Sequence, residues 1–118
     1  MVSVLILDDD PDTRDLLMQY CAFAGVRGLP AADASAALRI ALAEQPSLAL
    51  VDLRLVDSDG IQFVQKLRAA QVGKRTRVVL LTAMPIIDEN IYLSAGADLV
   101  MQKPLGIPAF QDLLWGLA

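Results

Sequence analysis

The sequence predicts an α/β protein in which a five-stranded parallel sheet lies between layers of helices. Five apolar segments of strand length alternate with five segments whose apolar residues recur every three or four positions. Such alternation is typical of a parallel sheet with right-handed crossover connections. Hydrophobic residues make up 55% of the chain and the mean hydropathy is +0.48, which fits strands buried on both faces. The 118 residues correspond to a single domain, residues 1–118.

The first strand is expected at residues 3–7, and a helix with clear end signals follows it. Asp10 precedes Pro11, a pair typical of a helix start, because aspartate caps the free N–H groups and proline already has a helical φ. Gly25 is expected to end this helix in the left-handed conformation. The apolar face predicted for it consists of Leu16, Leu17, Tyr20, Phe23 and Ala24.

A short second strand is expected at residues 26–29, with Pro30 at its exit or on an edge of the sheet. Asp33 is suited to cap the second helix, and Pro46 stops it. The apolar stripe predicted for this helix comprises Ala34, Ala37, Leu38, Ala41 and Leu42.

The segment at residues 48–52 is an unbroken apolar run that ends in the carboxylate of Asp52. The turn-prone residues 57–60 follow, so the run is interpreted as a strand buried on both faces. The third helix comes after Gly60, and its predicted inward residues are Ile61, Val64 and Leu67.

The fourth and fifth strands are predicted at residues 77–82 and 99–101. A loop beginning at Met84 leads from the fourth strand into a helix that ends near Gly96. The last helix is expected over residues 106–117, with an apolar face of Phe110, Leu113, Leu114 and Leu117.

Charge and composition exclude several classes of function. Fourteen acidic and ten basic residues give a net charge of −4, which argues against a nucleic-acid-binding surface. There is no histidine, and the one cysteine, Cys21, is expected to be a small packed hydrophobe in a reducing, intracellular setting. Cys/His zinc sites and histidine-dependent nucleophiles are therefore excluded. No apolar run reaches membrane-spanning length and no basic leader precedes the first strand, so we expect a cytoplasmic protein without membrane contact.

Four of the predicted strands end at reactive side chains. Asp8 and Asp9 follow the first strand, Asp52 ends the third, Thr82 ends the fourth, and Lys103 follows the fifth. In a parallel sheet these ends lie on one edge, which is also where ligands bind in open α/β sheets. We therefore expect the five side chains to converge.

This set of residues fits phosphoryl transfer to a carboxylate. Three carboxylates repel one another unless a cation lies between them, and Mg²⁺ accepts one or two carboxylates while leaving room for phosphate oxygens. Asp52 would then attack phosphorus in line and form an acyl phosphate. Lys103 would pair with one phosphoryl oxygen, and Thr82 would donate a hydrogen bond to another.

Six short motifs occur in the order, and near the spacing, of a known family, and together they span essentially the whole chain. They are Leu7-Asp8-Asp9-Asp10-Pro11, Val51-Asp52-Leu53, Asp59-Gly60, Leu81-Thr82-Ala83, Gly96-Ala97-Asp98 and Lys103-Pro104. In these motifs the chain resembles the receiver domain of two-component response regulators, which has the chemotaxis-type doubly wound fold. The resemblance implies a flavodoxin-like fold of three layers with strand order 2-1-3-4-5.

The resemblance also implies roles for individual residues. Asp52 would accept a phosphoryl group from a histidine kinase or phosphotransfer protein. Asp9 would bind Mg²⁺ directly and Asp8 mainly through water, and Asp52 and the backbone carbonyl of Arg54 would complete the ligands, with Mn²⁺ as a substitute ion. A cis peptide is implied between Lys103 and the proline that follows it.

As a receiver, the chain would be a signalling domain that catalyses only its own phosphorylation and dephosphorylation. It would relay the signal by a conformational change to an output domain or partner protein. No output domain is expected within residues 1–118. Self-association through the fourth and fifth predicted helices is a further expectation.

Two positions depart from the family pattern. Val56 stands four residues after Asp52, where the family usually has proline, and Val100 stands where it usually has Tyr or Phe. Because valine has no ring to swing inward, we hypothesise that the signal leaves through the loop after Thr82 and the fourth helix.

Two rival functions remain. A pseudo-receiver would keep the fold as an interaction module without phosphorylation. A haloacid-dehalogenase-like phosphatase would need Asp-x-Asp followed two residues later by Thr or Val, whereas Asp8 and Asp10 put Asp12 at that position. The turn at residues 57–60 does not match an EF-hand, whose first and last ligand positions would be Leu55 and Lys66.

Overall fold

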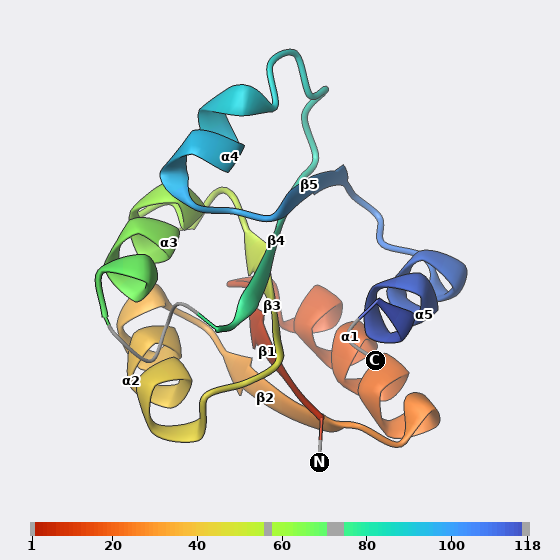
Figure 1. The fold of residues 1–118 in the computed structure, drawn as a ribbon. Coiled ribbons are helices and arrows are strands. Elements are labelled where there is room, and N and C mark those ends of the chain that lie inside the picture. Colours follow the sequence, from red (N-terminus) through yellow and green to blue (C-terminus); the bar gives the residue numbers. More distant parts are fainter. Residues whose placement is uncertain (1, 56–57, 71–74, 117–118) are drawn as a thin grey trace.

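The computed structural model describes residues 2–55, 58–70 and 75–116 and has the predicted α/β architecture (Figure 1). Its elements are β1 (Ser3–Leu7), α1 (Pro11–Ala24), β2 (Arg27–Ala31), α2 (Ala34–Glu44), β3 (Leu48–Asp52), α3 (Gly60–Ala69), β4 (Arg77–Thr82), α4 (Asn90–Ala95), β5 (Leu99–Gln102) and α5 (Ile107–Trp115). The strands pair in parallel in the order β2-β1-β3-β4-β5, as the resemblance implied. The predicted fold class is confirmed.

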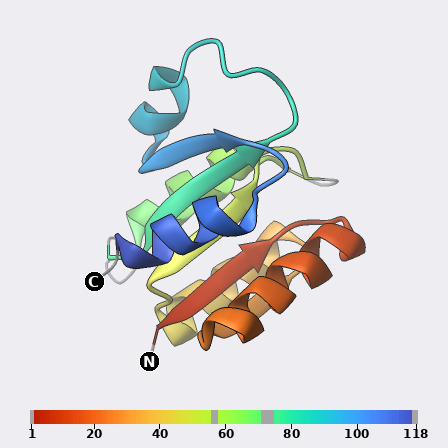
Figure 2. The same cartoon turned by 90° about the vertical axis from the view of Figure 1, so that its right-hand side faces the viewer.

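Helices cover both faces of the sheet and give the molecule three layers (Figures 1 and 2). α1 and α5 lie on one face, and α2, α3 and α4 lie on the other. Successive strand residues point to opposite faces, so in β1 Leu5 and Leu7 join the core under α2 and α3, while Val4 and Ile6 join the core under α1 and α5. All four side chains are buried, which explains why β1 is a continuous apolar run.

The predicted helix ends are confirmed for α1 and α2. The Asp10 carboxylate accepts a hydrogen bond from the Asp12 N–H, and Gly25 ends α1 with φ of 74°. Asp33 caps α2 by accepting from the Ala36 N–H. Among the helices of the described residues, none has both the length and the apolar character that crossing a bilayer requires.

Two strand boundaries differ from the prediction. β2 extends over Arg27–Ala31 and contains Pro30, which pairs with Ile6. Among the strands that the structure describes, β2 is at the edge and pairs with β1 alone, so a proline there interrupts no second ladder. β5 is one residue longer than expected and includes Gln102, and α5 begins one residue late, at Ile107. Residue 117, predicted to end the last helix, lies outside the described residues.

The predicted apolar face of α1 was partly wrong. Its buried residues are Leu17 and Cys21, whereas Leu16 is 42% exposed and Phe23 is 81% exposed. With about 100° of rotation per residue, positions 16 and 23 lie roughly a quarter-turn or more from Leu17. The contact with the sheet is narrower than the stripe that the spacing predicts, and these two side chains fall outside it. Tyr20 is partly buried, and its hydroxyl donates to the Leu105 carbonyl at 3.1 Å.

The stripes of the other helices were predicted more accurately. α2 buries Ala37 and Ala41 but leaves Leu42 37% exposed. α3 buries the predicted Val64 and Leu67, together with Phe63, which the spacing did not indicate. The predicted Phe110 and Leu113 are the buried residues of α5.

Cys21 is the small packed hydrophobe expected from the sequence, since it is 1% exposed in the core beneath α1. Burial raises the pKa of its thiol to about 11. We therefore predict that Cys21 stays unreactive toward a disulfide reagent in the folded protein at pH 8 and reacts fully once the protein is unfolded in guanidinium. Equal labelling rates in native and unfolded protein would contradict this burial.

Candidate functional site

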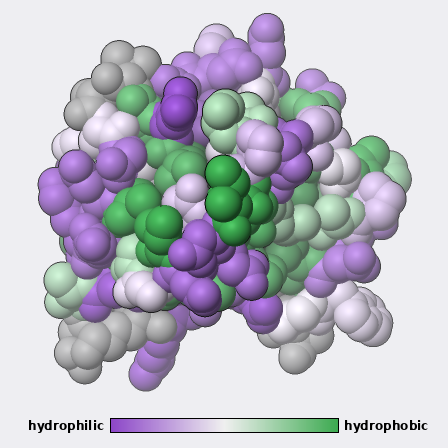
Figure 3. Space-filling model, turned by 90° about the horizontal axis from the view of Figure 1, so that it is seen from above, coloured by the Kyte–Doolittle hydropathy of each residue, from purple (hydrophilic) through white to green (hydrophobic). Residues whose placement is uncertain are grey.

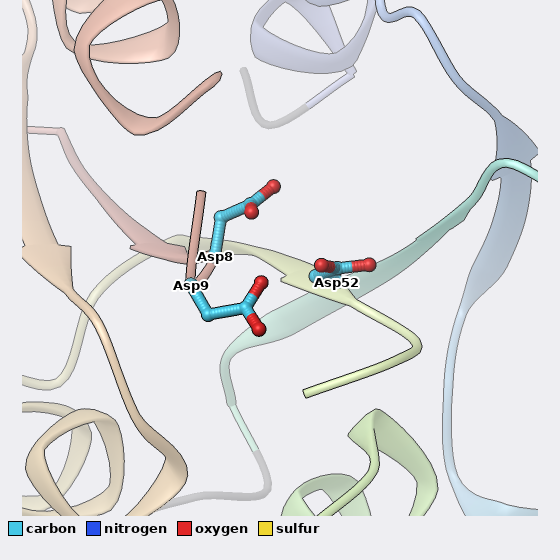
Figure 4. A group of neighbouring side chains, drawn as sticks. All are labelled: Asp8, Asp9 and Asp52. Carbon is cyan, nitrogen blue, oxygen red and sulfur yellow. The ribbon is translucent and has the colours of Figure 1, made fainter. Parts of the chain in front are cut away.

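Three carboxylates meet at the carboxyl edge of the sheet. Asp8 and Asp9 follow β1, and Asp52 ends the neighbouring β3. One oxygen from each of the three lies within 4.8 Å of the others, and Figure 4 shows the groups gathered at the ends of these strands. The parallel register brings them together because Leu7 pairs with Val51, so the next residue of each strand emerges at the same edge. The convergence expected from the sequence is therefore present for these residues.

Lys103 comes to the same place from β5, two strands away from β3. Its Nζ lies 2.8 Å from Asp8 Oδ2 and 3.5 Å from Asp52 Oδ1, so one cation contacts two of the three acids. The Lys103 N–H donates to the Thr82 carbonyl at 2.7 Å, which fixes the end of β5 against β4. Burial lowers the pKa of Lys103, but its hydrogen bond to Asp8 and the charge of Asp52 outweigh burial, so the pKa is raised overall.

Asp8 and Asp9 differ in their surroundings. The Asp8 side chain is buried, and its two oxygens accept hydrogen bonds from the Asp10 N–H, at 2.9 Å, and from Lys103. Asp9 is only partly buried, and within the described residues its carboxylate accepts no hydrogen bond from the protein. Asp8 is thus held by donors from two sides, while Asp9 is open to a ligand.

Asp52 is partly buried, and its Oδ1 accepts from the Arg54 N–H at 3.3 Å. Burial raises the pKa of its carboxyl, the positive charge of Lys103 partly offsets this, and the charge of Asp8 raises the pKa further. These surroundings make ionisation of Asp52 less favourable than it is for an aspartate in water. The amide of Arg54 is part of the site, but a ligand role for its carbonyl stays a prediction.

Gly60, at the start of α3, lies directly behind Asp52. A Cβ at this position would come within 2.8 Å of the Asp52 carbonyl oxygen and 2.9 Å of Leu80 Cδ2, so no larger residue fits without a shift of the backbone. The Gly60 N–H donates to the Leu53 carbonyl at 2.8 Å. This close approach gives a physical reason for the glycine in the Asp59-Gly60 motif, and Asp59 caps α3 by accepting from the Gln62 N–H.

Thr82 ends β4 at the same edge and is 4% exposed. Its Oγ1 accepts a hydrogen bond from the Met84 N–H at 3.1 Å. The hydroxyl proton is not used in that bond, so the side chain keeps a donor for another group. Thr82 therefore lies at the predicted edge and is already linked to the loop that follows it.

The remaining sequence-predicted features fall into three groups. The peptide between Lys103 and Pro104 is cis, as the resemblance implied. Val100 is a core residue, 8% exposed and paired with Leu80. Val56 and Asp57 lie outside the described residues.

Sequence reasoning missed two arginines that organise the loops. Arg14, in the first turn of α1, donates from its guanidinium to the Asp8 carbonyl at 2.8 Å. Arg68 on α3 donates to the Gly96 carbonyl at 2.9 Å and forms an ion pair with Asp98 at 2.9 Å. Neither contact follows from hydrophobic periodicity. The one available signal in the sequence is that Arg14 lies on a helix close to the motif that contains Asp8.

Comparison with known proteins decides the family. Residues 4–114 match the family described as response regulator receiver domain. The chain belongs to this family. It is therefore a signalling domain, the receiver domain of two-component response regulators, a family that binds Mg²⁺ at an acidic pocket.

Similar curated proteins include the KDP operon transcriptional regulatory protein KdpE of Escherichia coli, 34% identical over 114 residues, covering 97% of this chain and 50% of that protein. The probable transcriptional regulatory protein TcrX of Mycobacterium tuberculosis is 32% identical over 107 residues, which cover 90% of this chain and 45% of TcrX. The receiver thus spans about half the length of these curated relatives.

Solved structures of similar fold include the chemotaxis protein CheY4 of Vibrio cholerae, with a TM-score of 0.91, 24% identity and coverage of 100% of this chain and 99% of that chain. A CheY-like response regulator receiver domain protein of Methanospirillum hungatei has a TM-score of 0.88 and 26% identity, covering 98% of this chain and 92% of that chain. Both agree with the three-layer receiver fold.

The electrostatics of Asp52 predict how stability depends on pH. Because its folded-state pKa lies above the ordinary value of 3.8, the ionised carboxylate opposes folding at neutral pH, and this cost disappears as the pH falls through the two pKa values. We expect Asp52→Asn to raise the free energy of unfolding in EDTA at pH 7, because the amide does not carry the cost of burying an ionised carboxylate.

Urea unfolding at pH 7 and pH 3.5 measures this difference. The gain should shrink at the lower pH. Asp112→Asn, which removes an exposed carboxylate on α5, serves as the control and should change stability little. A less stable Asp52→Asn protein at pH 7 would mean that the ion pair with Lys103 outweighs burial.

Proposed function

We propose that this receiver domain accepts a phosphoryl group on Asp52 from a histidine kinase or phosphotransfer protein, in the presence of Mg²⁺. The observation that supports this most is the group of three carboxylate oxygens within 4.8 Å, with Lys103 in contact with two of them. A donor set of carboxylate oxygens, with no histidine or thiolate in reach, fits a hard divalent cation. Asp9, Asp8, Asp52 and the Arg54 carbonyl would hold Mg²⁺, with Mn²⁺ as a substitute.

The chain's own residues have distinct roles in this transfer. A carboxylate oxygen of Asp52 attacks phosphorus, a P–O bond to Asp52 forms, and the bond to the donor's leaving group breaks with its electron pair remaining on that group. Bound metal supplies neutralisation of the phosphoryl charge. Lys103 Nζ pairs with a phosphoryl oxygen, and the Thr82 hydroxyl donates to another. Hydrolysis of the same acyl phosphate resets the domain, and no other catalysed reaction is proposed.

The route by which the signal leaves the site follows from Thr82. Its Oγ1 already accepts from the Met84 N–H at 3.1 Å, so a movement of this side chain toward a phosphoryl group would also move the Ala83–Met84 peptide of the β4–α4 loop. This loop and α4 expose Met84 (53%), Ile87 (95%) and Ile91 (59%). Figure 3, which views the molecule from the α4 side, shows hydrophobic groups set among hydrophilic ones on this face. We propose that a partner reads this segment, without a ring movement at Val100.

Partners and location are part of the same proposal. The unit is residues 1–118, placed in the cytoplasm, with a histidine kinase or phosphotransfer protein upstream and an output domain or protein downstream. The exposed Ile91 on α4 and Trp115 on α5, 59% and 83% exposed, support a homodimer through these helices. The net charge of −4 supports the absence of direct nucleic-acid binding by these 118 residues, although relatives such as KdpE are named as transcriptional regulators.

Incubation with acetyl phosphate and Mg²⁺, followed by intact mass spectrometry, tests phosphorylation. We predict one added phosphoryl group in the wild-type protein and none in Asp52→Asn. Asp112→Asn, which keeps the acid cluster and removes a distant exposed carboxylate, should be modified like the wild type. The absence of an adduct in the wild type would support the pseudo-receiver alternative, and steady turnover of small phosphate esters would support a phosphatase.

NMR of the beryllofluoride-bound protein tests the proposed signal route. We predict amide shift changes across residues 84–95 relative to the free protein, because the Thr82 side chain that would move toward the beryllofluoride also holds the Met84 N–H. Thr82→Ala should still bind beryllofluoride at Asp52 but lose most of the changes in that segment. If residues 84–95 do not shift in the wild-type protein, the signal leaves by another route.

A further inference from the structure

Asp8 is held at all of its polar atoms. Its N–H donates to the Ala31 carbonyl at 3.2 Å, its Oδ1 accepts from the Asp10 N–H and its Oδ2 accepts from Lys103. The remaining atom, the backbone carbonyl oxygen, accepts at 2.8 Å from the guanidinium of Arg14. In the proposed metal site, hydrogen bonds therefore hold the backbone of Asp8 as well as its side chain.

The bond from Arg14 controls a particular peptide unit. The carbonyl of Asp8 and the N–H of Asp9 belong to the same planar group, so fixing one end fixes the other. Within the described residues, the Asp9 carboxylate has no hydrogen bond of its own, and the direction of the Asp9 side chain then depends on that backbone. Arg14 can hold it because the Asp10 cap and the bond from the Arg14 N–H to the Asp10 carbonyl, at 3.0 Å, fix the first turn of α1.

We propose that Arg14 is a positioning residue for the divalent-cation site: its guanidinium, through the Asp8 carbonyl, presets the Asp9 carboxylate for the metal. This inference rests on the proposed function, since it assumes that the acid cluster binds Mg²⁺. Arg14 itself does not touch the ion. Groups that orient metal ligands from behind typically contribute 10- to 100-fold to metal affinity.

The charge of Arg14 and its hydrogen bond to the Asp8 carbonyl have opposite expected effects on Mg²⁺ affinity. This difference makes the proposal testable. A positive guanidinium near the site repels an incoming cation. If charge were its only effect, removing it would strengthen Mg²⁺ binding. Removing it as the anchor of the Asp8–Asp9 peptide would weaken Mg²⁺ binding. The sign of the change in affinity therefore separates the two effects.

The experiment titrates the unphosphorylated protein with Mg²⁺ and follows the amide shifts of residues 8–10 and 52–54 by NMR. We expect Arg14→Met to weaken Mg²⁺ binding roughly tenfold, the lower end of the range for such outer groups. Arg14→Lys, which keeps the charge and one donor but loses the planar guanidinium, should fall between Arg14→Met and wild type. Arg39→Met removes a charge from an exposed position on α2 and should bind like the wild type.

Urea unfolding in EDTA accompanies the titration and gives the metal-free stability of each variant. If Arg14→Met is too unstable to titrate, the Mg²⁺ affinity of Arg14→Lys is compared with that of Arg39→Met instead. Unchanged or tighter Mg²⁺ binding in both Arg14 variants overturns the inference, even if their stability falls. A wild-type protein that does not bind Mg²⁺ overturns the proposed function instead, so the two failures are distinguishable.

Discussion

The crowding of three carboxylates at one edge of a buried sheet is the constraint on which the rest of the structure depends. Asp8 is almost fully buried, and oxygens of Asp8, Asp9 and Asp52 lie within 4.8 Å of one another. Lys103 compensates part of this charge through contacts of 2.8 and 3.5 Å, yet the pKa of Asp52 remains raised. One lysine does not balance three acids, so the folded protein carries a negative site that a divalent cation would complete.

The fold meets this constraint with short, tightly held connections. α1 begins two residues after Asp9, with the Asp10 carboxylate as its cap and Arg14 reaching back to the Asp8 carbonyl. On the other side of the site, α3 begins at Gly60, which packs so closely on the Asp52 carbonyl that it has no room for a side chain. The acids therefore lie between two fixed helix starts, and their positions are set by backbone hydrogen bonds as much as by their own contacts.

This division explains what the sequence could predict. Strands buried on both faces are unbroken apolar runs, so the order of apolar and polar residues predicts that β3 ends at Asp52 and β4 at Thr82, and parallel topology then places both on one edge. The strand order came from the family resemblance, because periodicity does not encode which strands are neighbours. The exposure of Phe23 and the contact from Arg14 could not be predicted, since each depends on how a helix is rotated against the sheet.

The core around Val100 bears on how such a site would communicate with the surface. Val100 is 8% exposed and packs among the buried residues that include Leu80, its partner on β4. Valine has no aromatic ring, so a rotamer change at this position cannot move a ring between the interior and the surface. Thr82, by contrast, lies directly before the exposed β4–α4 loop, and its Oγ1 accepts a hydrogen bond from the Met84 N–H. A movement of Thr82 would therefore reach Met84 through this hydrogen bond, which supports the proposal that the backbone of the β4–α4 loop is the moving part.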